Sequence, residues 1–160
     1  MSFSSRDFRD CLGQFATGVA VVTARANNGA KAGITINSFA SVSLDPALVL
    51  FSVDQRATTH SLFAGECDRF CINILNRDQR DLSDLFSSPV HDRWEDLVFE
   101  DDCHGVPKLI GNLATFSCKR HAIHDGGDHS IIVGHVQDIS LGNTGDPLLY
   151  YGGRYRSLGK

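Results

Sequence analysis

Uncharged hydrogen-bonding side chains gather in one segment of the sequence, residues 31–54, KAGITINSFASVSLDPALVLFSVD. The polar centre of this segment is a run of four residues, Thr35, Ile36, Asn37 and Ser38. No acidic residue precedes Asp45 in the segment. Hydroxyl and amide groups donate and accept hydrogen bonds without carrying charge. The segment is therefore suited to a neutral ligand held by hydrogen bonds.

Small hydroxyl residues also open the segment 56–65, RATTHSLFAG, which ends in glycine. This pattern predicts a short helix with Thr58 or Thr59 near its N-terminus. Free N–H groups and the helix dipole at that end, together with the hydroxyls of Thr58, Thr59 and Ser61, would form an anion seat. Serine and threonine at a helix start also act as plain caps, so both interpretations remain open.

Three histidines are candidates for chemistry. His129 follows the turn Asp125-Gly126-Gly127-Asp128, and from the residues alone a histidine at the start of a strand is the simpler interpretation. His121 and His124 are three residues apart in a predicted strand, where that spacing sends side chains to opposite faces. We expect no metal site there.

The five cysteines contain no CxxC pair and follow no secretion signal, which favours reduced thiols. Cys67 and Cys71 flank the start of a predicted strand. Free cysteine in that setting most often behaves as a small buried hydrophobic residue, and we prefer this interpretation to a metal or redox role.

The composition predicts one domain, residues 1–160, because this length supports one sizeable core. A net charge of −4 provides no general attraction for nucleic acid or an anionic membrane. No apolar run reaches the roughly 20 residues that a membrane-spanning helix needs. The N-terminal residues lack a basic segment followed by an apolar block, so we expect a cytoplasmic protein.

The elements that must position these groups are mostly short strands. Strands are predicted at 19–26, 34–44, 47–54, 69–75, 112–124, 130–141 and 147–155, and helices at 4–16, 56–65 and 76–87. We expect the first helix to lie on the sheet. Segment 88–112 is predicted to be irregular, as a lid, a subunit contact or a wrapped loop.

Turns between consecutive strands are too short for parallel crossovers. The pattern therefore predicts a mainly β fold, a closed antiparallel β-barrel with Greek-key character and two or three peripheral helices. The sequence lacks GxGxxG after a strand, GxxxxGK[ST], HExxH and GxSxG. These absences argue against a Rossmann dehydrogenase, a P-loop enzyme, a zincin and an α/β-hydrolase.

Five segments in order carry a family resemblance. They are TGVAVVTA (17–24), GITINSFASVSLDPALVLFSV (33–53), FCINIL (70–75), GGDHSIIVGHV (126–136) and PLLYYGGRY (147–155). From about residue 8 to residue 158, the chain resembles the flavin-reductase-like family, which has the FMN-binding split-barrel fold. Small reductase components of two-component flavin-dependent monooxygenases belong to this family.

The resemblance implies a homodimer that binds FMN or FAD and uses NADH or NADPH as hydride donor. It implies that Thr35, Asn37 and Ser38, with Ile36 between them, bind the flavin ring or ribityl chain, and that Ser52 and Val53 line the ring. It further implies phosphate binding by Thr58, Thr59 and Ser61. The family often has an arginine and a serine or threonine near residues 54–60, where Arg56 and His60 stand here. His129 is expected to orient the nicotinamide, and Tyr155 to close the surroundings of the ring.

The implied ligand agrees with the chemistry of the polar segment. An oxidised flavin ring is neutral and rich in donors and acceptors, and it gains negative charge on reduction, so uncharged groups suit it better than carboxylates. The leading hypothesis is an NAD(P)H-dependent flavin reductase that releases reduced flavin to a monooxygenase. Two alternatives are a flavin sensor or carrier without turnover, and a reductase that retains flavin and passes electrons to iron or another protein.

Overall fold

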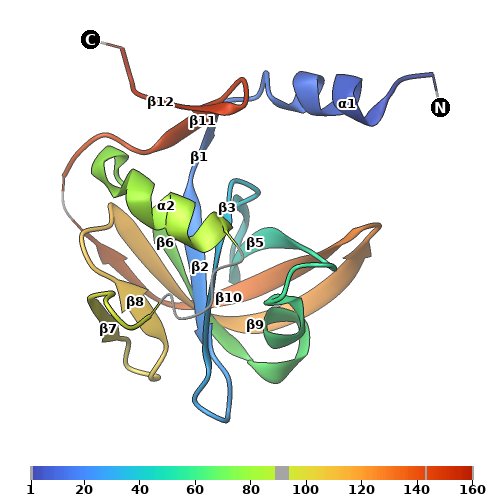
Figure 1. Ribbon diagram of the computed structural model, residues 1–160. Helices are drawn as coiled ribbons and strands as arrows, with labels where there is room; N and C mark the ends of the chain where they lie inside the picture. Colours follow the sequence, from blue (N-terminus) through green and yellow to red (C-terminus); the bar gives the residue numbers. More distant parts are fainter. Residues whose placement is uncertain (1, 89–93, 143, 160) are drawn as a thin grey trace.

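A computed structural model describes residues 2–88, 94–142 and 144–159, and its architecture is mainly antiparallel β (Figure 1). The strands are β1 (Thr17–Gly18), β2 (Ala20–Arg25), β3 (Lys31–Ile36), β4 (Ala40–Leu44), β5 (Ala47–Asp54), β6 (Arg69–Ile74), β7 (Phe99–Asp101), β8 (Pro107–Leu109), β9 (Ala114–Gly126), β10 (His129–Leu141), β11 (Leu149–Tyr151) and β12 (Arg154–Arg156). The helical elements are α1 (Ser5–Leu12), the π-helix η1 (Leu62–Glu66), the 3₁₀ turn η2 (Arg77–Gln79) and α2 (Arg80–Ser87).

The main sheet has seven strands in the order β3-β2-β6-β9-β10-β5-β4, and all neighbours are antiparallel. β3 comes into contact range of β5, so the sheet is strongly curled. No ladder joins the end strands β3 and β4 within the described ranges. The mainly β class is confirmed, whereas closure into a barrel stays a prediction.

Two hydrophobic clusters cover the two sides of β2, which explains why this strand is apolar almost throughout. Inside the curl, Phe51, Phe70 and Ile132 are fully buried. On the outer side, Val21 and Leu75 pack in the same cluster as Phe86 of α2. The approach of α2 is close, since a Cβ added at Gly33 would lie 2.3 Å from a ring carbon of Phe86.

The hairpin predictions are confirmed. β2 and β3 pair across the turn at Asn27-Asn28-Gly29, where Gly29 has φ +88°. β9 and β10 pair from His129↔Gly126 onward, and Gly127 in their turn has φ +80°. The C-terminal segment differs from the single predicted strand: Gly152 and Gly153, both with positive φ, reverse the chain and divide it into the hairpin β11–β12.

The first helix forms but does not lie on the sheet as predicted. Ser4 and Asp7 form a reciprocal capping box that starts α1, yet no residue of α1 is buried. Figure 1 shows α1 extending away from the sheet beside the β11–β12 hairpin. Its attachment includes Gly152 N–H to Gly13 O (2.8 Å) and Tyr151 Oη to Gln14 Oε1 (3.0 Å).

Segment 88–112 contains more order than predicted. β7 and β8 form a small hairpin, and Trp94 packs against Phe86 and Phe99 with ring centroids 5.3 Å away in each case. The described part, 94–112, packs on the molecule as a wrapped loop, and a role as a lid or a subunit contact stays a prediction. Residues 89–93 lie outside the described residues.

Candidate flavin and nicotinamide site

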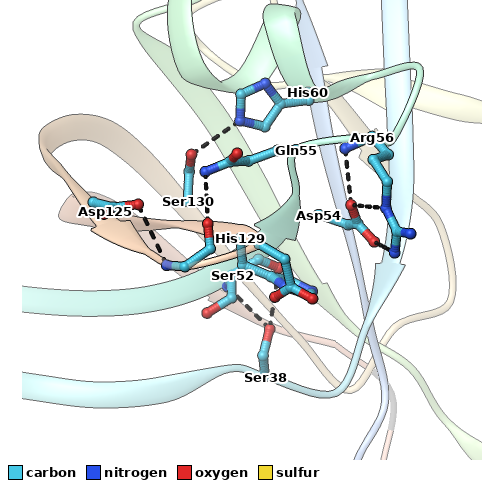
Figure 2. A network of polar contacts seen from close by, with 11 residues as sticks. Ser38, Ser52, Asp54, Gln55, Arg56, His60, Asp125, His129 and Ser130 are labelled. Carbon is cyan, nitrogen blue, oxygen red and sulfur yellow. Dashed lines mark hydrogen bonds and ion pairs between the residues drawn. The ribbon is translucent and has the colours of Figure 1, made fainter. Parts of the chain in front are cut away.

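Two polar segments that are far apart in the sequence meet at one end of the β5–β10 pair (Figure 2). The antiparallel register places Ser52 opposite Ile131, Val53 opposite Ser130 and Asp54 opposite His129. Consequently, the loop after β5 lies beside the turn before β10. The ladder therefore brings the predicted phosphate segment and the predicted nicotinamide residue to the same place.

Ser38 connects the polar run after β3 to β5. Its Oγ accepts a hydrogen bond from the Ser52 N–H at 3.0 Å and donates one to the Ser52 carbonyl at 3.3 Å. The hydroxyl of Ser38 therefore holds the backbone of the strand. Val53 is buried at 1% exposure, so its side chain belongs to the core and only its main chain can face a ligand.

Arg56 is held by Asp54. The guanidinium donates through Nε to Asp54 Oδ1 (3.1 Å) and through Nη2 to Oδ2 (2.8 Å), and Arg56 N–H also reaches Oδ1 (2.8 Å). The side-chain hydrogen bonds, and then the backbone hydrogen bond, hold the pKa of Asp54 far below its ordinary value. A phosphate that used Arg56 would have to compete with this carboxylate.

The two histidines at this end have polar partners. His60 Nε2 lies 2.9 Å from Ser130 Oγ, which ties the loop to β10. His129 Nδ1 lies 2.7 Å from Asp128 Oδ1, and the His129 side chain is 41% exposed. His129 is therefore oriented by its neighbour and accessible to a ligand from solvent.

The helix predicted with Thr58 or Thr59 near its N-terminus forms: residues 60 and 61 are α-helical, and Phe63 N–H donates to Thr59 O (3.2 Å). Two turns, Ala57 N–H to Asp54 O and His60 N–H to Ala57 O, lead into this helix, which takes π-helical form from Leu62. Thr58 and Ser61 are exposed and Thr59 is half-buried, so an anion here would meet hydroxyls at the start of a short helix.

The remaining predicted residues form a second group against α2. Thr35 Oγ1 donates to Ser83 O (2.7 Å), and Tyr155 Oη lies 2.8 Å from Ser83 Oγ and 3.0 Å from Asp84 Oδ1. Burial, followed by the Asp84 hydrogen bond and charge, raises the pKa of Tyr155 despite the opposing Ser83 bond. The phenol is therefore neutral and anchored to α2.

A pocket of about 260 Å³ lies within this second group and is lined by Val19, Thr35, Ile36, Asn37, Ser83, Ser87, Tyr150 and Tyr155. Asn37 and Tyr150 also line an adjacent pocket of about 470 Å³ beneath α1. Asn37 is exposed and has no described side-chain hydrogen bond, so its amide is free to bind a ligand between the two pockets.

The family model described as the flavin reductase like domain matches residues 12–159. The chain belongs to this flavin reductase family. It is 47% identical over 152 residues to the FMN reductase (NADH) SmoA of Agrobacterium fabrum, covering 95% of this chain and 85% of that protein.

Two further similarities extend along the reductase domain. One is to the reductase subunit HsaB of a flavin-dependent monooxygenase from Rhodococcus jostii, at 37% identity over 154 residues, covering 96% of this chain and 77% of HsaB. The other is to the solved NADH:FAD oxidoreductase SgcE6 of Streptomyces globisporus in complex with NAD and FAD fragments. That structure has a TM-score of 0.90 at 31% identity, covering 97% of this chain and 93% of SgcE6.

The described residues of this flavin reductase domain fit a flavin by their chemistry. Uncharged donors and acceptors of β3, α2 and the two C-terminal tyrosines line the smaller pocket, and the Asn37 amide, which both pockets share, is unpaired within the described contacts. Such groups suit a ring that changes its charge on reduction.

The buried thiols take no part in this site. Burial raises the pKa of Cys67 to about 11 and that of Cys118 to about 12, and it also raises the pKa of Cys71. The prediction that Cys67 and Cys71 behave as buried hydrophobic residues is confirmed. Among the described residues, no cluster of three or more His, Cys, Asp or Glu side chains could hold a metal ion.

Sequence reasoning missed Ser83, Gln55 and Ser130. Ser83 lies on α2 and is brought to Thr35 and Tyr155 only by tertiary packing, so no local pattern marks it. Ser130 follows His129 in the recognised GGDHS motif, and that motif was the available signal. Gln55 lies between two predicted site segments without a signal of its own.

Proposed function

We propose that this member of the flavin reductase family is an NAD(P)H:flavin oxidoreductase that reduces FMN or FAD by hydride transfer. The similarity to an NADH-dependent FMN reductase over nearly the whole chain supports the activity. The observation that carries the proposal is the register of β5 with β10, which brings the His129 turn beside the end of β5, where Ser52 and Asp54 lie, and beside the 55–61 loop. SgcE6 has a similar fold and was solved with NAD and FAD fragments, which supports binding of both cofactors by the present domain.

In this proposal, the flavin lies against the polar residues at the ends of β3 and β5. Asn37, with the main-chain groups of Ser52 and Val53, binds the ring, while the side chains of Thr35, Ile36 and Ser38 shape its surroundings. Tyr155 closes the pocket and keeps its hydroxyl on α2. The phosphate binds the turn formed by Arg56, Thr58, Thr59, His60 and Ser61. A bound flavin supplies the ring that accepts hydride, and the protein supplies position and a hydrogen-bonding environment.

His129 orients the nicotinamide. Hydride transfer requires a donor ring held at near-attack distance over the acceptor and no strong acid or base. A half-exposed imidazole fixed by Asp128 is suited to bind the nicotinamide carboxamide while the flavin face stays open to it. His129 therefore contributes by orienting the nicotinamide ring over the flavin.

The protein is also proposed to act as a homodimer. Apolar side chains along α1 and just after it are exposed, namely Phe8, Leu12 and Phe15. An apolar helix surface that the described chain leaves uncovered is a typical contact surface. α1 is therefore the expected contribution of each protomer to the interface.

The product is proposed to be diffusible reduced flavin, delivered in the cytoplasm to a monooxygenase component. The similarity to HsaB, the reductase subunit of a flavin-dependent monooxygenase, supports a partner of this class. Within the described residues, no helix combines the length and the apolar character needed to cross a membrane.

The decisive experiment is steady-state oxidation of NADH and NADPH with FMN and FAD, in all four pairings, on protein first checked for bound flavin. We expect flavin to accelerate nicotinamide oxidation strongly for at least one pairing. If no pairing exceeds the rate without protein, the proposed activity is wrong. Flavin that stays bound through gel filtration would contradict release as a diffusible product.

Two variants separate the proposed subsites. Asn37→Ala should weaken flavin affinity by about 1 kcal/mol or more, because a hydrogen-bonding partner is removed. His129→Ala should raise the KM for the nicotinamide while flavin affinity stays near normal. A selective loss of flavin binding in His129→Ala would reverse the assignment of His129.

A further inference from the structure

The turn that precedes His129 consists of two residues, Gly127 and Asp128, between the paired residues Gly126 and His129. Gly126 and Gly127 are adjacent, and Gly127 adopts φ +80°. The side-chain contact within the turn is a long one, from Gly127 N–H to Asp125 Oδ1 at 3.3 Å. Glycine leaves the backbone many accessible conformations. A contact from outside the turn would restrict these conformations and with them the side chain of Asp128.

Gln55 provides this contact twice. Its backbone N–H donates to the Asp128 carbonyl at 3.0 Å, and its Nε2 donates to the Gly127 carbonyl at 3.1 Å. Figure 2 shows the Gln55 side chain reaching across from the β5 loop to the turn. Both carbonyls at the tip of the turn are thereby bound by one residue of the opposite segment.

The position of His129 depends on that turn. The partner of its imidazole is Asp128, which belongs to the turn and is itself largely exposed. The ladder fixes the backbone of His129 opposite Asp54, but the residue that orients the ring lies just outside the ladder. The position of the Asp128 side chain therefore depends on the turn backbone, whose carbonyls Gln55 binds.

We propose that Gln55 is a positioning residue for the nicotinamide: by binding the Gly127 and Asp128 carbonyls, it fixes the Asp128–His129 pair relative to the loop after β5. This proposal rests on the proposed function of His129. Gln55 acts through the turn and touches neither cofactor. The His60–Ser130 contact joins the same two segments one residue further along β10.

The chemistry explains why this fixation matters. Hydride transfer depends on a narrow range of distance and orientation, and small misplacements far from the reacting atoms reduce the rate strongly. Loss of one hydrogen bond of ordinary strength corresponds to a change of about threefold to tenfold in an equilibrium constant. The effect should fall on the nicotinamide and leave flavin binding nearly unchanged.

The test uses the full-length protein with FMN and NADH and compares Gln55→Met with Gln137→Met. Methionine has nearly the length of glutamine and no charge, and it lacks the amide donor. Gln137 is exposed on β10, the strand that begins at His129, and its side chain has no hydrogen bond in the described structure. Gln137→Met is therefore the matched control for the substitution itself.

For Gln55→Met we expect a rise of about threefold to tenfold in the KM for NADH, a flavin Kd within about twofold of the parent value, and faster amide hydrogen exchange at residues 126–129. Gln137→Met should change none of the three. Faster exchange with an unchanged KM would overturn the proposal, because the turn would then be loosened without consequence. Unchanged exchange would overturn it as well, because the side-chain contact would then not fix the turn.

Failure of the proposed function would look different. If the parent protein did not oxidise NADH with any flavin, the activity itself would be absent, whereas the exchange measurement would still report whether Gln55 fixes the turn. An equal loss of flavin and nicotinamide affinity in Gln55→Met would also overturn the proposal, since it would indicate general loosening of the loop.

Discussion

Asn73 should be one of the most stabilising polar side chains of this protein. It is fully buried on β6, and its amide makes four hydrogen bonds. Nδ2 donates to the Val21 carbonyl (3.0 Å) and to Thr23 Oγ1 (3.1 Å). Oδ1 accepts from the Leu109 N–H and from Asn112 Nδ2, both at 3.0 Å. Asn73 therefore joins the sheet to the wrapped loop that contains β8.

The magnitude follows from which groups lose their partners in Asn73→Ala. Asn112 Nδ2 keeps the Leu109 carbonyl and Thr115 Oγ1, so it stays satisfied. The buried Leu109 N–H loses the acceptor described for it, which costs about 1–3 kcal/mol. The other lost bonds and the small cavity add to this, and the expected decrease in unfolding free energy is about 3 kcal/mol. Such a loss is a large part of the stability of a typical domain, about 5–15 kcal/mol.

The assay is urea unfolding followed by far-UV circular dichroism and by Trp94 fluorescence. Trp94 packs against Phe86 and Phe99 and reports on the wrapped loop, whereas the circular dichroism reports on the sheet. Asn27→Ala, in the exposed β2–β3 turn, is the matched control and should stay within about 0.5 kcal/mol of the parent. A decrease below about 1 kcal/mol for Asn73→Ala would refute the reasoning, because a buried orphaned N–H should cost more.

Three shorter predictions follow from other contacts. Gly134→Ala should lower the unfolding free energy by about 1–3 kcal/mol in the same urea assay, because the added Cβ would lie 2.5 Å from the buried Phe70 ring; an unchanged midpoint would contradict this. Tyr155→Phe removes a hydroxyl that bonds to α2 and should cost about 1 kcal/mol of stability, with flavin affinity by fluorescence titration changing less than about threefold; a much larger loss would mean that the hydroxyl binds flavin. The Arg56 hydrogen bonds lower the pKa of Asp54 in the folded state, so their stabilisation is present at neutral pH and is lost as the pH falls below about 4. Melting temperatures at pH 7 and pH 3 should therefore differ less in Asp54→Asn than in the parent, and an equal difference would contradict this.

Local patterns were sufficient for most of the sheet. The β-branched run 19–26, the Asn-Asn-Gly turn and the alternating segments at 112–124 and 130–141 each specify their structure within a few residues, and all became strands or hairpins. Antiparallel hairpins form between neighbours in the sequence, so the information that defines them is local.

The exceptions depend on contacts between distant residues. The periodicity of residues 4–16 predicts a helix but does not identify the surface on which the helix packs. In the structure, α1 is attached to the β11–β12 hairpin and does not pack on the sheet. The site is divided into one group at β10 and another at α2. The second group forms around Ser83, which only tertiary packing brings to Thr35 and Tyr155.

The register shift in β4 has a consequence for the behaviour of the protein in a crowded cell. Ser41 pairs with Val49 and Ser43 with Leu48, so Val42 is an extra residue in a strand that has a ladder partner on one side only within the described chain. Val42 and Leu44 are exposed, and a flat edge of this kind would invite further strands. A bulge twists the edge and interrupts the even spacing of its backbone donors and acceptors. An incoming strand thus cannot continue the pairing past residue 42, which lowers the tendency of concentrated protein to aggregate through this edge.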